Sequence, residues 1–477
     1  MTSATSRYAR VHVPEERPEE RTADFREVLH SYTREEAVLE AQRCLQCALP
    51  FCVEACPITQ DCRGYIGLIA DGRFDEAARL TLVANPLATT LCKVCYHYCE
   101  DACVMKGRGT PIAIRHLKRA ALEFGDSHQM YVPSVPKHQR IAVIGAGPAG
   151  LMAAWELGLR GYGVTVFEKQ LAVGGQAGAI PRYRMPNHEL LIDLQRFRNF
   201  DVTFVEGKTA GVDFTPESLL EEGYRAVFVA IGASQARTPG VPGETLPGVL
   251  FALDFLLDIN QGRHVALGEK IIVVGGGDVA VDAVRTSLRL SPKARVTMAY
   301  RRTRAESPAG EEELRETEPE GIGFRWLLSP LRILGTDHVE GMVFEKMELG
   351  PTDESGRRAI RPIAGATEAI ECDTVILAVG EKADLTGFPA ELKLTIGTKG
   401  WPEGSRADTM TAVEGVFAAG GRSVVHAMAA GTRAAEGIDA YLARKDGRAP
   451  IPRPDPFGAG ELPAWIPKGY AGPVWRP

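Results

Sequence analysis

The sequence predicts an α/β fold with two Rossmann-like units behind a helical, cysteine-rich segment. Apolar runs alternate with helical patterns over residues 140–447, which is the pattern of a parallel sheet covered by helices. A strand, a glycine turn and a helix follow one another twice within this stretch. Nine of the ten cysteines lie between Cys44 and Cys103. The 477 residues are too many for one ordinary core, so we expect several domains.

Local signals divide the chain into segments. Thr33 and Glu36 have the spacing of a capping box, so a helix should begin there and run toward Cys44. Residues 74–84 have a helical apolar period, and residues 126–137 contain two prolines without one, which indicates a linker. The expected segments are a helical cysteine domain at 1–135, a first nucleotide domain at 138–238 that resumes at 373–447, a second nucleotide domain at 239–372, and a proline-rich tail at 448–477.

Composition narrows the class of protein and its surroundings. The net charge of −6 argues against binding to nucleic acid, which favours a basic surface. No apolar stretch is long enough to span a bilayer, and the first 25 residues have no secretory signal. We therefore expect a cytoplasmic protein. In a reducing cytosol, closely spaced cysteines indicate metal or cluster ligation rather than disulfides.

The first glycine motif follows an apolar run at residues 141–144. Gly145 permits a tight turn, Gly147 lets the backbone approach a pyrophosphate, and Gly150 lets helix and strand pack closely. The next strand ends at Glu168, whose carboxylate can accept hydrogen bonds from ribose hydroxyls. A glycine turn without a ligand is the less favoured interpretation. The predicted cofactor-binding residues of this site are Gly145, Gly147, Pro148, Ala149, Gly150, Glu168, Lys169, Gly175, Gly232 and Gly420.

The second glycine motif repeats this pattern, with Ala280 at the third position. Its following strand, residues 295–299, leads into Tyr300-Arg-Arg-Thr-Arg304 and has no acid at its end. Arginines there can pair with a 2′-phosphate, which favours NADP(H) without excluding NAD(H). The alternative is that the arginines form a solvated face and pair with Glu311–Glu313. The predicted residues are Gly275, Gly277, Asp278, Val279, Ala280, Arg301 and Arg302.

Two dinucleotide folds in one chain imply two dinucleotides, most simply a flavin and a nicotinamide with hydride transfer between their rings. Thioredoxin-reductase-like enzymes share this layout and carry a Cys-x-x-Cys pair that the flavin reduces. No such pair occurs after residue 103. The flavin should therefore exchange electrons with another group.

The cysteines form two runs in the sequence, Cys44-x2-Cys47-x4-Cys52-x3-Cys56-Pro57 and Cys92-x2-Cys95-x3-Cys99-x3-Cys103, and each run can wrap a cubane iron–sulfur cluster. Zinc is the main alternative, because Cys-x-x-Cys also suits a tetrahedral ion. Cys62 and Cys372 have no partner at ligand spacing, so we expect small buried side chains. His97 is either a ligand, a nearby hydrogen-bond donor or a plain loop residue. The predicted metal ligands are Cys44, Cys47, Cys52, Cys56, Cys92, Cys95, Cys99 and Cys103.

These motifs, together with the run Tyr300 to Pro308, resemble the small (β) subunit of glutamate synthase and its relatives. The resemblance covers roughly residues 35–445 and extends to the N-terminal half of dihydropyrimidine dehydrogenase and the large subunit of NADH-dependent ferredoxin:NADP oxidoreductase. It implies one FAD, two [4Fe–4S] clusters, and an NADPH domain inserted between two halves of the FAD domain. It further implies that Cys44, Cys47, Cys52 and Cys103 hold one cluster, and that Cys56, Cys95 and Cys99 hold the other with one more ligand.

Three positions depart from this family. The further ligand is a Glu or Gln in some relatives, and the matching position here is Lys118, so Cys92 is the expected substitute. The interval between Cys95 and Cys99 is also shorter than usual. A late Gly-Asp pair, whose acid touches the flavin ribityl chain, is replaced by Gly420-Gly421, which implies either weaker FAD binding or another contributing group.

The resemblance implies an electron-transfer oxidoreductase subunit that exchanges electrons between NAD(P)H and a catalytic or electron-accepting partner subunit, or ferredoxin. A strongly reducing partner would drive NAD(P)⁺ reduction instead, as in a diaphorase subunit of a complex that oxidises a 2-oxoacid, formate or hydrogen. A stand-alone NADPH:ferredoxin-type reductase and a redox sensor without FAD are the competing hypotheses. Hydride transfer between rings requires positioning more than proton transfer, so no catalytic acid or base is predicted.

Overall fold

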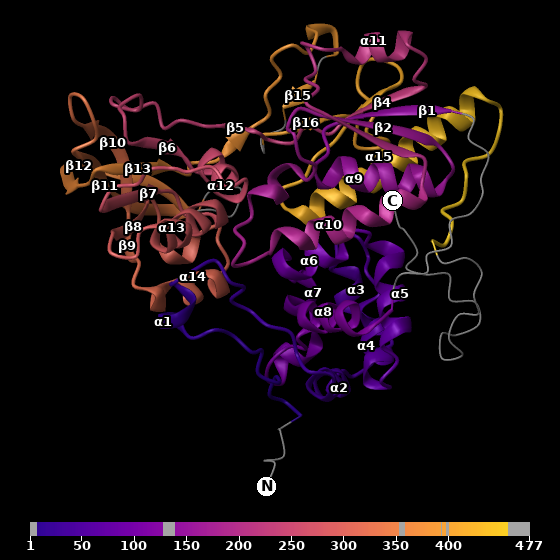
Figure 1. The fold of residues 1–477 in the computed structure, drawn as a ribbon, viewed down its shortest axis with the longest axis horizontal. Coiled ribbons are helices and arrows are strands. Elements are labelled where there is room, and N and C mark those ends of the chain that lie inside the picture. Colours follow the sequence, from indigo (N-terminus) through magenta and orange to yellow (C-terminus); the bar gives the residue numbers. More distant parts are fainter. Residues whose placement is uncertain (1–6, 127–138, 353–357, 393, 397–399, 457–477) are drawn as a thin grey trace.

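The computed structural model describes residues 7–126, 139–352, 358–392, 394–396 and 400–456 (Figure 1). A helical domain and two parallel α/β domains make up this part of the chain, as the sequence predicts. The first residues of the helical domain, most of the expected linker at 126–137 and residues 457–477 of the proline-rich tail lie outside the described residues. No helix among the described residues combines the length and apolar character that crossing a membrane would require.

Short helices pack around one apolar core in the cysteine domain. The capping box predicted at Thr33 is present: its hydroxyl accepts a hydrogen bond from the Glu36 amide, and the Glu36 carboxylate accepts one from the Thr33 amide. The predicted helix at 74–84 is confirmed with the same bounds. The helices are α2 (Arg34–Gln42), α3 (Phe51–Glu54), α4 (Cys62–Ala70), α5 (Phe74–Ala84), α6 (Ala88–Val94), α7 (Tyr98–Asp101), η1 (Val104–Gly107) and α8 (Ile114–Phe124).

The first nucleotide domain is built on a five-stranded parallel sheet in the order β17-β4-β1-β2-β3. Its central strand β1 places Val143 between Val166 of β2 and Phe228 of β4. All four residues of β4 are buried, which suits a strand covered on both faces. The strands are β1 (Arg140–Ile144), β2 (Gly163–Glu168), β3 (Val202–Glu206), β4 (Ala226–Val229) and β17 (Val416–Ala418).

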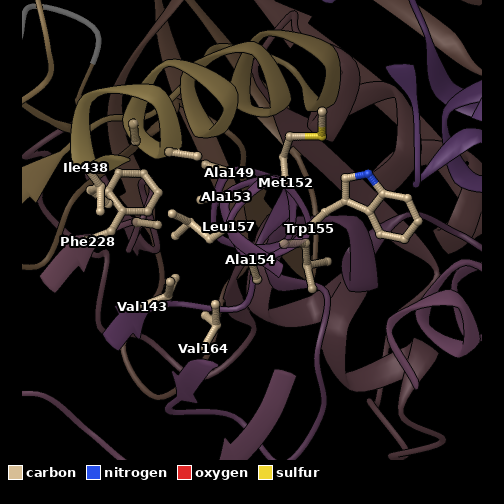
Figure 2. Packing of buried hydrophobic residues seen from close by; sticks show 14 of the residues in the cluster. Val143, Ala149, Met152, Ala153, Ala154, Trp155, Leu157, Val164, Phe228 and Ile438 are labelled. Atoms are coloured by element: carbon tan, nitrogen blue, oxygen red, sulfur yellow. The ribbon is translucent and has the colours of Figure 1, made fainter. Parts of the chain in front are cut away.

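Two helices, α9 (Pro148–Leu159) and α15 (Val424–Lys445), pack against each other beside this sheet. Figure 2 shows Ala149, Ala153 and Ile438 in the core that the helices share with the strands. A Cβ at Gly431 of α15 would lie 2.2 Å from the Ala149 carbonyl oxygen, so the two backbones are in direct contact. This contact fixes the first turn of α9 against the third turn of α15.

The second nucleotide domain also has a five-stranded parallel sheet, in the order β6-β13-β7-β8-β9. Helices α12 (Ala252–Asn260) and α13 (Asp278–Leu290) pack on it, and an antiparallel sheet of β10, β11 and β12 flanks it. The strands are β6 (Val249–Phe251), β7 (Lys270–Val274), β8 (Arg295–Tyr300), β9 (Gly323–Trp326), β10 (Leu328–Leu334), β11 (Gly341–Thr352), β12 (Arg358–Glu371) and β13 (Thr374–Leu377).

The position of β13 differs from the expected boundary at residue 372. This strand pairs with β6 and β7 of the second sheet, with Val375 opposite Ile272, so the second domain extends to Leu377. The chain leaves the first domain through β5 (Gln235–Ala236) and returns through β14 (Glu381–Lys382), and these two strands pair antiparallel. The connections between the domains therefore run side by side.

Further short helices and strands complete the two nucleotide domains. In the first domain they are η2 (Gly175–Ala179), α10 (Asn187–Gln195), η3 (Arg196–Asn199), α11 (Pro216–Glu221), η6 (Ala390–Leu392), β15 (Thr395–Ile396) and β16 (Pro402–Glu403); in the second they are η4 (Arg304–Glu306), α14 (Glu311–Thr317) and η5 (Glu318–Glu320).

The two ends of the described chain join domains together. The N-terminal segment reaches the second nucleotide domain at α1 (Pro18–Arg21), which lies beside α14 (Figure 1). Arg21 donates to the Glu320 carboxylate at 2.8 Å, and both side chains are buried. Near the other end, Arg453 donates to Glu156 of α9 and to the Val83 carbonyl of α5. The described start of the proline-rich tail thus lies on this chain itself.

Candidate functional site: two nucleotide loops and two cysteine groups

The first cysteine group surrounds a cavity between α3, α4 and η1. Cys44, Cys47, Cys52 and Cys103 line this cavity together with apolar side chains. All four cysteines are partly exposed. Burial, with a smaller contribution from the neighbouring sulfurs, raises the pKa of Cys44 to about 11. The structure thus brings together the four residues expected to share one cluster.

The second group comprises Cys56, Cys95 and Cys99. Burial raises the pKa of Cys56 to about 12, with the nearby sulfurs of Cys99 and Cys95 adding to the effect. Cys56 and Cys95 pack against the core of the first nucleotide domain, whereas Cys99 packs against the core of the helical domain. This group therefore lies at the junction of the two domains.

Cys92 lies on α6, one turn before Cys95, and is 4% exposed. Its thiol donates to the Thr89 carbonyl at 3.0 Å within the same helix. Burial raises the pKa of Cys92 to about 11, and the nearby Lys118 ammonium opposes that increase. Cys92 as fourth ligand of the second group remains a prediction.

The chemistry of the donors fits clusters. In the described part of the chain, no three His, Cys, Asp or Glu side chains converge so as to hold a metal ion. The first four thiols instead surround a cavity, which suits a larger group with several iron atoms. The raised pKa values of Cys44 and Cys56 indicate that these thiols need a positive group before they become thiolate ligands.

Cys62 and Cys372 are both buried, as predicted. Cys372 lies in the core beneath the second sheet. Cys62 lies between the two cysteine groups, and its thiol hydrogen-bonds with Cys52, which lowers the pKa of Cys52. A contact with Cys99 accompanies it. Sequence spacing gave no signal for this position, because Cys62 reaches both groups only through the packing of α4.

The first glycine loop leads from β1 into α9. Gly145 has a φ of 104°, and a Cβ at Gly150 would lie 2.0 Å from the Gly145 carbonyl oxygen. Gly147 is the N-cap residue of α9, with Pro148 and Ala149 as its first residues. The nearest atom to a Cβ at Gly147 would be the Gly175 Cα at 3.9 Å. This open backbone at a helix N-terminus fits a pyrophosphate.

The other residues predicted for this site lie at the carboxyl ends of neighbouring strands. Glu168 ends β2 and accepts a hydrogen bond from the Ala146 amide at 2.8 Å, so its carboxylate also closes the glycine loop. Lys169 donates to the Ser234 hydroxyl at 3.0 Å. Gly232 and Gly420 follow β4 and β17. Ligands of open parallel sheets bind at this edge.

Gly421 is enclosed by the first turn of α15. A Cβ there would lie 2.2 Å from the Ala427 amide nitrogen. The position at which the resemblance implies an aspartate therefore admits no side chain unless α15 moves. Ser423 caps this helix by accepting from the His426 amide, and its hydroxyl also contacts the His426 ring nitrogen Nδ1 at 2.8 Å.

The second glycine loop has the same construction. Gly277 is the N-cap residue of α13, Asp278 is its first residue, and Val279 and Ala280 follow. Gly275 precedes a close contact at Gly276, where a Cβ would lie 2.5 Å from the Tyr300 ring. Burial raises the pKa of Asp278, and its Oδ1 has no hydrogen-bond partner within the described residues. An unpaired buried acceptor at this loop is consistent with a ligand-binding role.

The loop after β8, for which the sequence predicted only an arginine role, covers the second glycine turn. Ser307 donates to the Gly276 carbonyl through its hydroxyl at 2.6 Å, and Ala309 donates to the same carbonyl through its amide at 3.1 Å. These residues fall in and directly after the run Tyr300 to Pro308 that carries the family resemblance. Ser307 lies within this run, so it is the residue from which the sequence could have indicated the contact with Gly276.

The arginines of this loop divide into two kinds. Arg301 is exposed and has no side-chain partner among the residues described here. Arg302 donates to the Arg358 carbonyl at 2.7 Å. Arg304 instead pairs with Glu311 and Glu318. The alternative of pairing with Glu311–Glu313 thus describes Arg304, while Arg301 remains open to a phosphate.

Aromatic and acidic residues join the second cysteine group to both nucleotide domains. Tyr98 packs against His426 of α15, with ring centroids 5.2 Å apart. His97 lies 2.8 Å from the Glu312 carboxylate of α14, and its backbone amide donates to the Cys95 sulfur at 3.4 Å. His97 is therefore a hydrogen-bonding neighbour of a predicted ligand, one of the roles considered for it.

Comparison with known families identifies the two α/β domains. Residues 139–435 match the family model described as pyridine nucleotide-disulphide oxidoreductase, which covers more than half of the chain. The chain belongs to this family. Residues 21–130 match a further model, described as dihydropyrimidine dehydrogenase domain II, 4Fe-4S cluster. This pyridine nucleotide-disulphide oxidoreductase is an FAD-dependent NAD(P)H oxidoreductase with a 4Fe–4S domain in front, which confirms the predicted fold class and enzyme type.

Individual relatives place it further within the family. It is 31% identical over 459 residues to the glutamate synthase [NADPH] small chain of Halomonas elongata, covering 90% of this chain and 96% of that protein. This confirms the resemblance to the glutamate synthase small subunit. It is 35% identical over 451 residues to the NADP(+)-dependent formate dehydrogenase subunit beta of Moorella thermoacetica, covering 87% of this chain but only 62% of that protein.

A solved structure shares the fold of the nucleotide domains. Mycobacterium tuberculosis FprA in complex with NADPH aligns with a TM-score of 0.55 at 20% identity, over 66% of this chain and 87% of that one. This similarity supports the predicted arrangement of two Rossmann-like domains.

Proposed function

We propose that this chain is the electron-transfer subunit that carries electrons between NADP(H) and a partner protein by way of FAD and two [4Fe–4S] clusters. The main supporting observation is the position of the second cysteine group. Cys56 and Cys95 pack against the core of the first nucleotide domain, whereas Cys44, Cys52 and Cys103 pack against the helical core. The second group therefore lies between the flavin domain and the first group.

The residues divide among the cofactors as follows. The glycine loop of the first domain holds FAD, and that of the second domain, with Arg301 and Arg302, holds NADP(H). One cluster is bound by the first cysteine group, and the other by the second group with Cys92 as its fourth ligand. The ligand residues are Cys44, Cys47, Cys52 and Cys103 for the first cluster, and Cys56, Cys92, Cys95 and Cys99 for the second.

When bound, the flavin supplies the change between hydride and single-electron chemistry, and the clusters supply one-electron transfer. The residues of this chain position the cofactors relative to one another. The helix N-termini at Gly147 and Gly277 would present backbone amides to the pyrophosphates of the two dinucleotides. Tyr98 against His426 holds the second cysteine group at the start of α15, beside Gly420 and Gly421. The flavin domain has no Cys-x-x-Cys pair that could take the electrons instead.

The opposite direction of electron flow is the second candidate. The relative from Moorella thermoacetica is named as a subunit of an NADP(+)-dependent formate dehydrogenase, and 87% of this chain aligns with it. A strongly reducing partner would then donate electrons through the first cluster, and NADP⁺ would be the acceptor. The same residues serve both directions, so the partner decides between them. A stand-alone reductase would instead elute as a monomer in gel filtration, and this monomer would reduce ferredoxin fully without a partner subunit.

The cofactor content tests the proposal first. We expect the purified chain to show flavin absorbance and about eight iron atoms, as two four-iron clusters require. Anaerobic NADPH should bleach the flavin and then produce the electron paramagnetic resonance signals of reduced clusters. A protein without flavin bands would rule the proposal out and favour the redox-sensor hypothesis.

The order of the cofactors is tested by Cys95→Ser. This variant should retain flavin reduction by NADPH and slow the reduction of the remaining cluster at least tenfold, because a step between flavin and first cluster is lost. Cys372→Ser is the matched control, since Cys372 is buried in the second sheet domain. An unchanged rate of cluster reduction in Cys95→Ser would show that the second group is not between the other two cofactors.

A further inference from the structure

Gln46 lies between Cys44 and Cys47 in the loop of the first cysteine group, and its backbone is in the left-handed region, with a φ of 48°. This conformation costs conformational free energy for any residue that carries a Cβ, so it is uncommon outside glycine. It persists only where the surroundings hold it, and residues of this kind cluster at functional sites. The contacts of Gln46 show what the conformation makes possible.

The side-chain amide of Gln46 donates to two acceptors. Nε2 donates to the Cys44 sulfur at 3.5 Å and to the Arg63 carbonyl of α4 at 3.2 Å. A primary amide has two donor hydrogens, so both bonds can form at once. Burial raises the pKa of Cys44, and a hydrogen bond from the Gln46 backbone amide to the same sulfur opposes that increase. The Cys44 sulfur thus accepts from both amides of one residue.

Helix α4 leaves room for this side chain at Gly67. A Cβ at Gly67 would lie 3.4 Å from Oε1 of Gln46, so the amide group packs against the helix where the helix has no side chain. Glycine inside a helix is unfavourable, and this packing gives a reason for its presence. The Arg63 side chain fastens the same loop by donating to the Cys47 carbonyl at 3.3 Å. Both α4 and the loop backbone therefore position the Gln46 amide.

The loop of the second cysteine group repeats only the backbone part of this arrangement. His97 has a φ of 44°, and its amide donates to the Cys95 sulfur at 3.4 Å. Its ring is directed elsewhere and contacts the Glu312 carboxylate at 2.8 Å. The side-chain donor at Cys44 thus distinguishes the first loop from the second.

We propose that Gln46 raises the reduction potential of the first [4Fe–4S] cluster by donating its side-chain amide to the Cys44 sulfur. This inference rests on the proposed function, because it presupposes a cluster at this group. Hydrogen bonds to the sulfurs are among the factors that set the potential of such a cluster. A donor stabilises the reduced form more, because reduction adds negative charge. Since this cluster exchanges electrons with the partner, Gln46 adjusts the driving force of that step.

The test measures the reduction potentials of both clusters by potentiometric titration followed by electron paramagnetic resonance, in the complete protein with its cofactors. Gln46→Met keeps the length of the side chain but removes the donor. It should disfavour reduction of the first cluster roughly three- to tenfold, which is about 28–59 mV for a one-electron couple, and leave the second unchanged. Cys44→Ser removes a ligand of the first cluster and so identifies its signal. Gln42→Met, at an exposed glutamine at the end of α2, is the control and should change neither potential.

A second variant separates the hydrogen bond from the backbone strain. Gln46→Gly removes the same donor but adopts the left-handed backbone without strain. It should lower the potential of the first cluster as Gln46→Met does, whereas its apparent melting temperature should be higher than that of Gln46→Met. A wild-type potential in Gln46→Gly would show that the side-chain amide does not set it, and would overturn the inference.

The outcomes separate this inference from the proposed function. If Gln46→Met retains flavin and about eight iron atoms with both potentials unchanged, the role of Gln46 is refuted while the proposed function stands. A shift confined to the second cluster would refute that role as well. If Gln46→Met loses iron, Gln46→Gly decides: a retained first cluster with a lowered potential supports the inference, and loss of that cluster shows that Gln46 serves assembly instead. A wild-type protein without iron would refute the proposed function itself.

Discussion

The Glu312 carboxylate lies 2.8 Å from Nε2 of His97, which joins the second nucleotide domain to the loop between Cys95 and Cys99. Glu312 is the second residue of α14 and lies only five residues after Ser307, whose hydroxyl donates to the Gly276 carbonyl. One short stretch of chain therefore touches both the nucleotide loop and the cysteine loop. Because the two contacts are made by different side chains, they can be tested one at a time.

Glu312→Gln should weaken the docking of the second nucleotide domain. Burial opposes ionisation of Glu312, but the hydrogen bond from His97 and the charge of Arg115 together hold its pKa well below the usual range. Removing the charge should cost about 1–3 kcal/mol at pH 7. A depressed folded-state pKa contributes stability above the unfolded value, about 4.3, and that stability is lost as the pH falls further.

The measurement is the apparent melting temperature of wild type and variant between pH 7 and pH 2. The difference should be largest at pH 7, stay nearly constant down to about pH 4.3, and shrink as the pH falls below that value toward the depressed folded-state pKa of Glu312. Glu311→Gln is the control, because Glu311 is exposed and pairs only with Arg304. A difference that stays constant with pH would show that the charge of Glu312 is not responsible.

Arg301→Ala should reduce the preference for NADPH over NADH. Arg301 is exposed and unpaired within the described residues, so it can bind a 2′-phosphate without breaking another contact. A charge-assisted hydrogen bond is worth about 1.5–3 kcal/mol, which corresponds to roughly 10–100-fold in kcat/KM for NADPH. Steady-state kinetics with both nucleotides provide the measurement. Arg304→Ala should change the ratio little, and an unchanged ratio in Arg301→Ala would mean that the phosphate binds elsewhere.

Gly150→Ala should abolish stable flavin binding. The added methyl group would lie 2.0 Å from the Gly145 carbonyl oxygen, so the glycine loop and α9 must separate. We expect at least a tenfold drop in the flavin retained per chain, measured by absorbance after gel filtration. Gly107→Ala is the matched control, because a methyl group there meets no atom within 4 Å. Normal flavin content in Gly150→Ala would contradict the assignment of this loop.

Gly421→Asp restores the acid found in the family but should not strengthen flavin binding. Its Cβ would lie 2.2 Å from the Ala427 amide nitrogen, and such overpacking costs about 1–3 kcal/mol. The apparent melting temperature should fall and the flavin should dissociate faster. Gly310→Asp, where a Cβ has open space, should leave both unchanged. Slower flavin release from Gly421→Asp would instead show that α15 adapts and that the missing acid weakens the site.

Local signals were sufficient for the elements that carry the glycine loops. The apolar runs before Gly145 and Gly275 became β1 and β7, because a buried parallel strand needs only a short apolar segment. The cysteine spacing predicted cluster ligands, but only the family resemblance predicted that Cys103 joins Cys44, Cys47 and Cys52, because these residues are far apart in the chain. The strands before the glycine loops depend on neighbours in sequence, and sequence therefore predicts them.

Features that depend on distant partners were not predictable. The run Thr374 to Val379 resembles the other strands, and nothing local assigns it to the second sheet; pairing with Ile271–Val274 does. Cys62 has no partner at ligand spacing in the sequence, yet the packing of α4 places it between the two cysteine groups.

The pair of Arg21 and Glu320 has a consequence for synthesis. The two residues are 299 positions apart, and both are buried in the finished protein. Arg21 leaves the ribosome long before its partner exists, and domains generally fold in the order in which they emerge. The helical domain must therefore form while the segment that carries Arg21 still lacks its final position. That segment can settle only when the second nucleotide domain has been translated, which makes its docking a late step in the maturation of the protein.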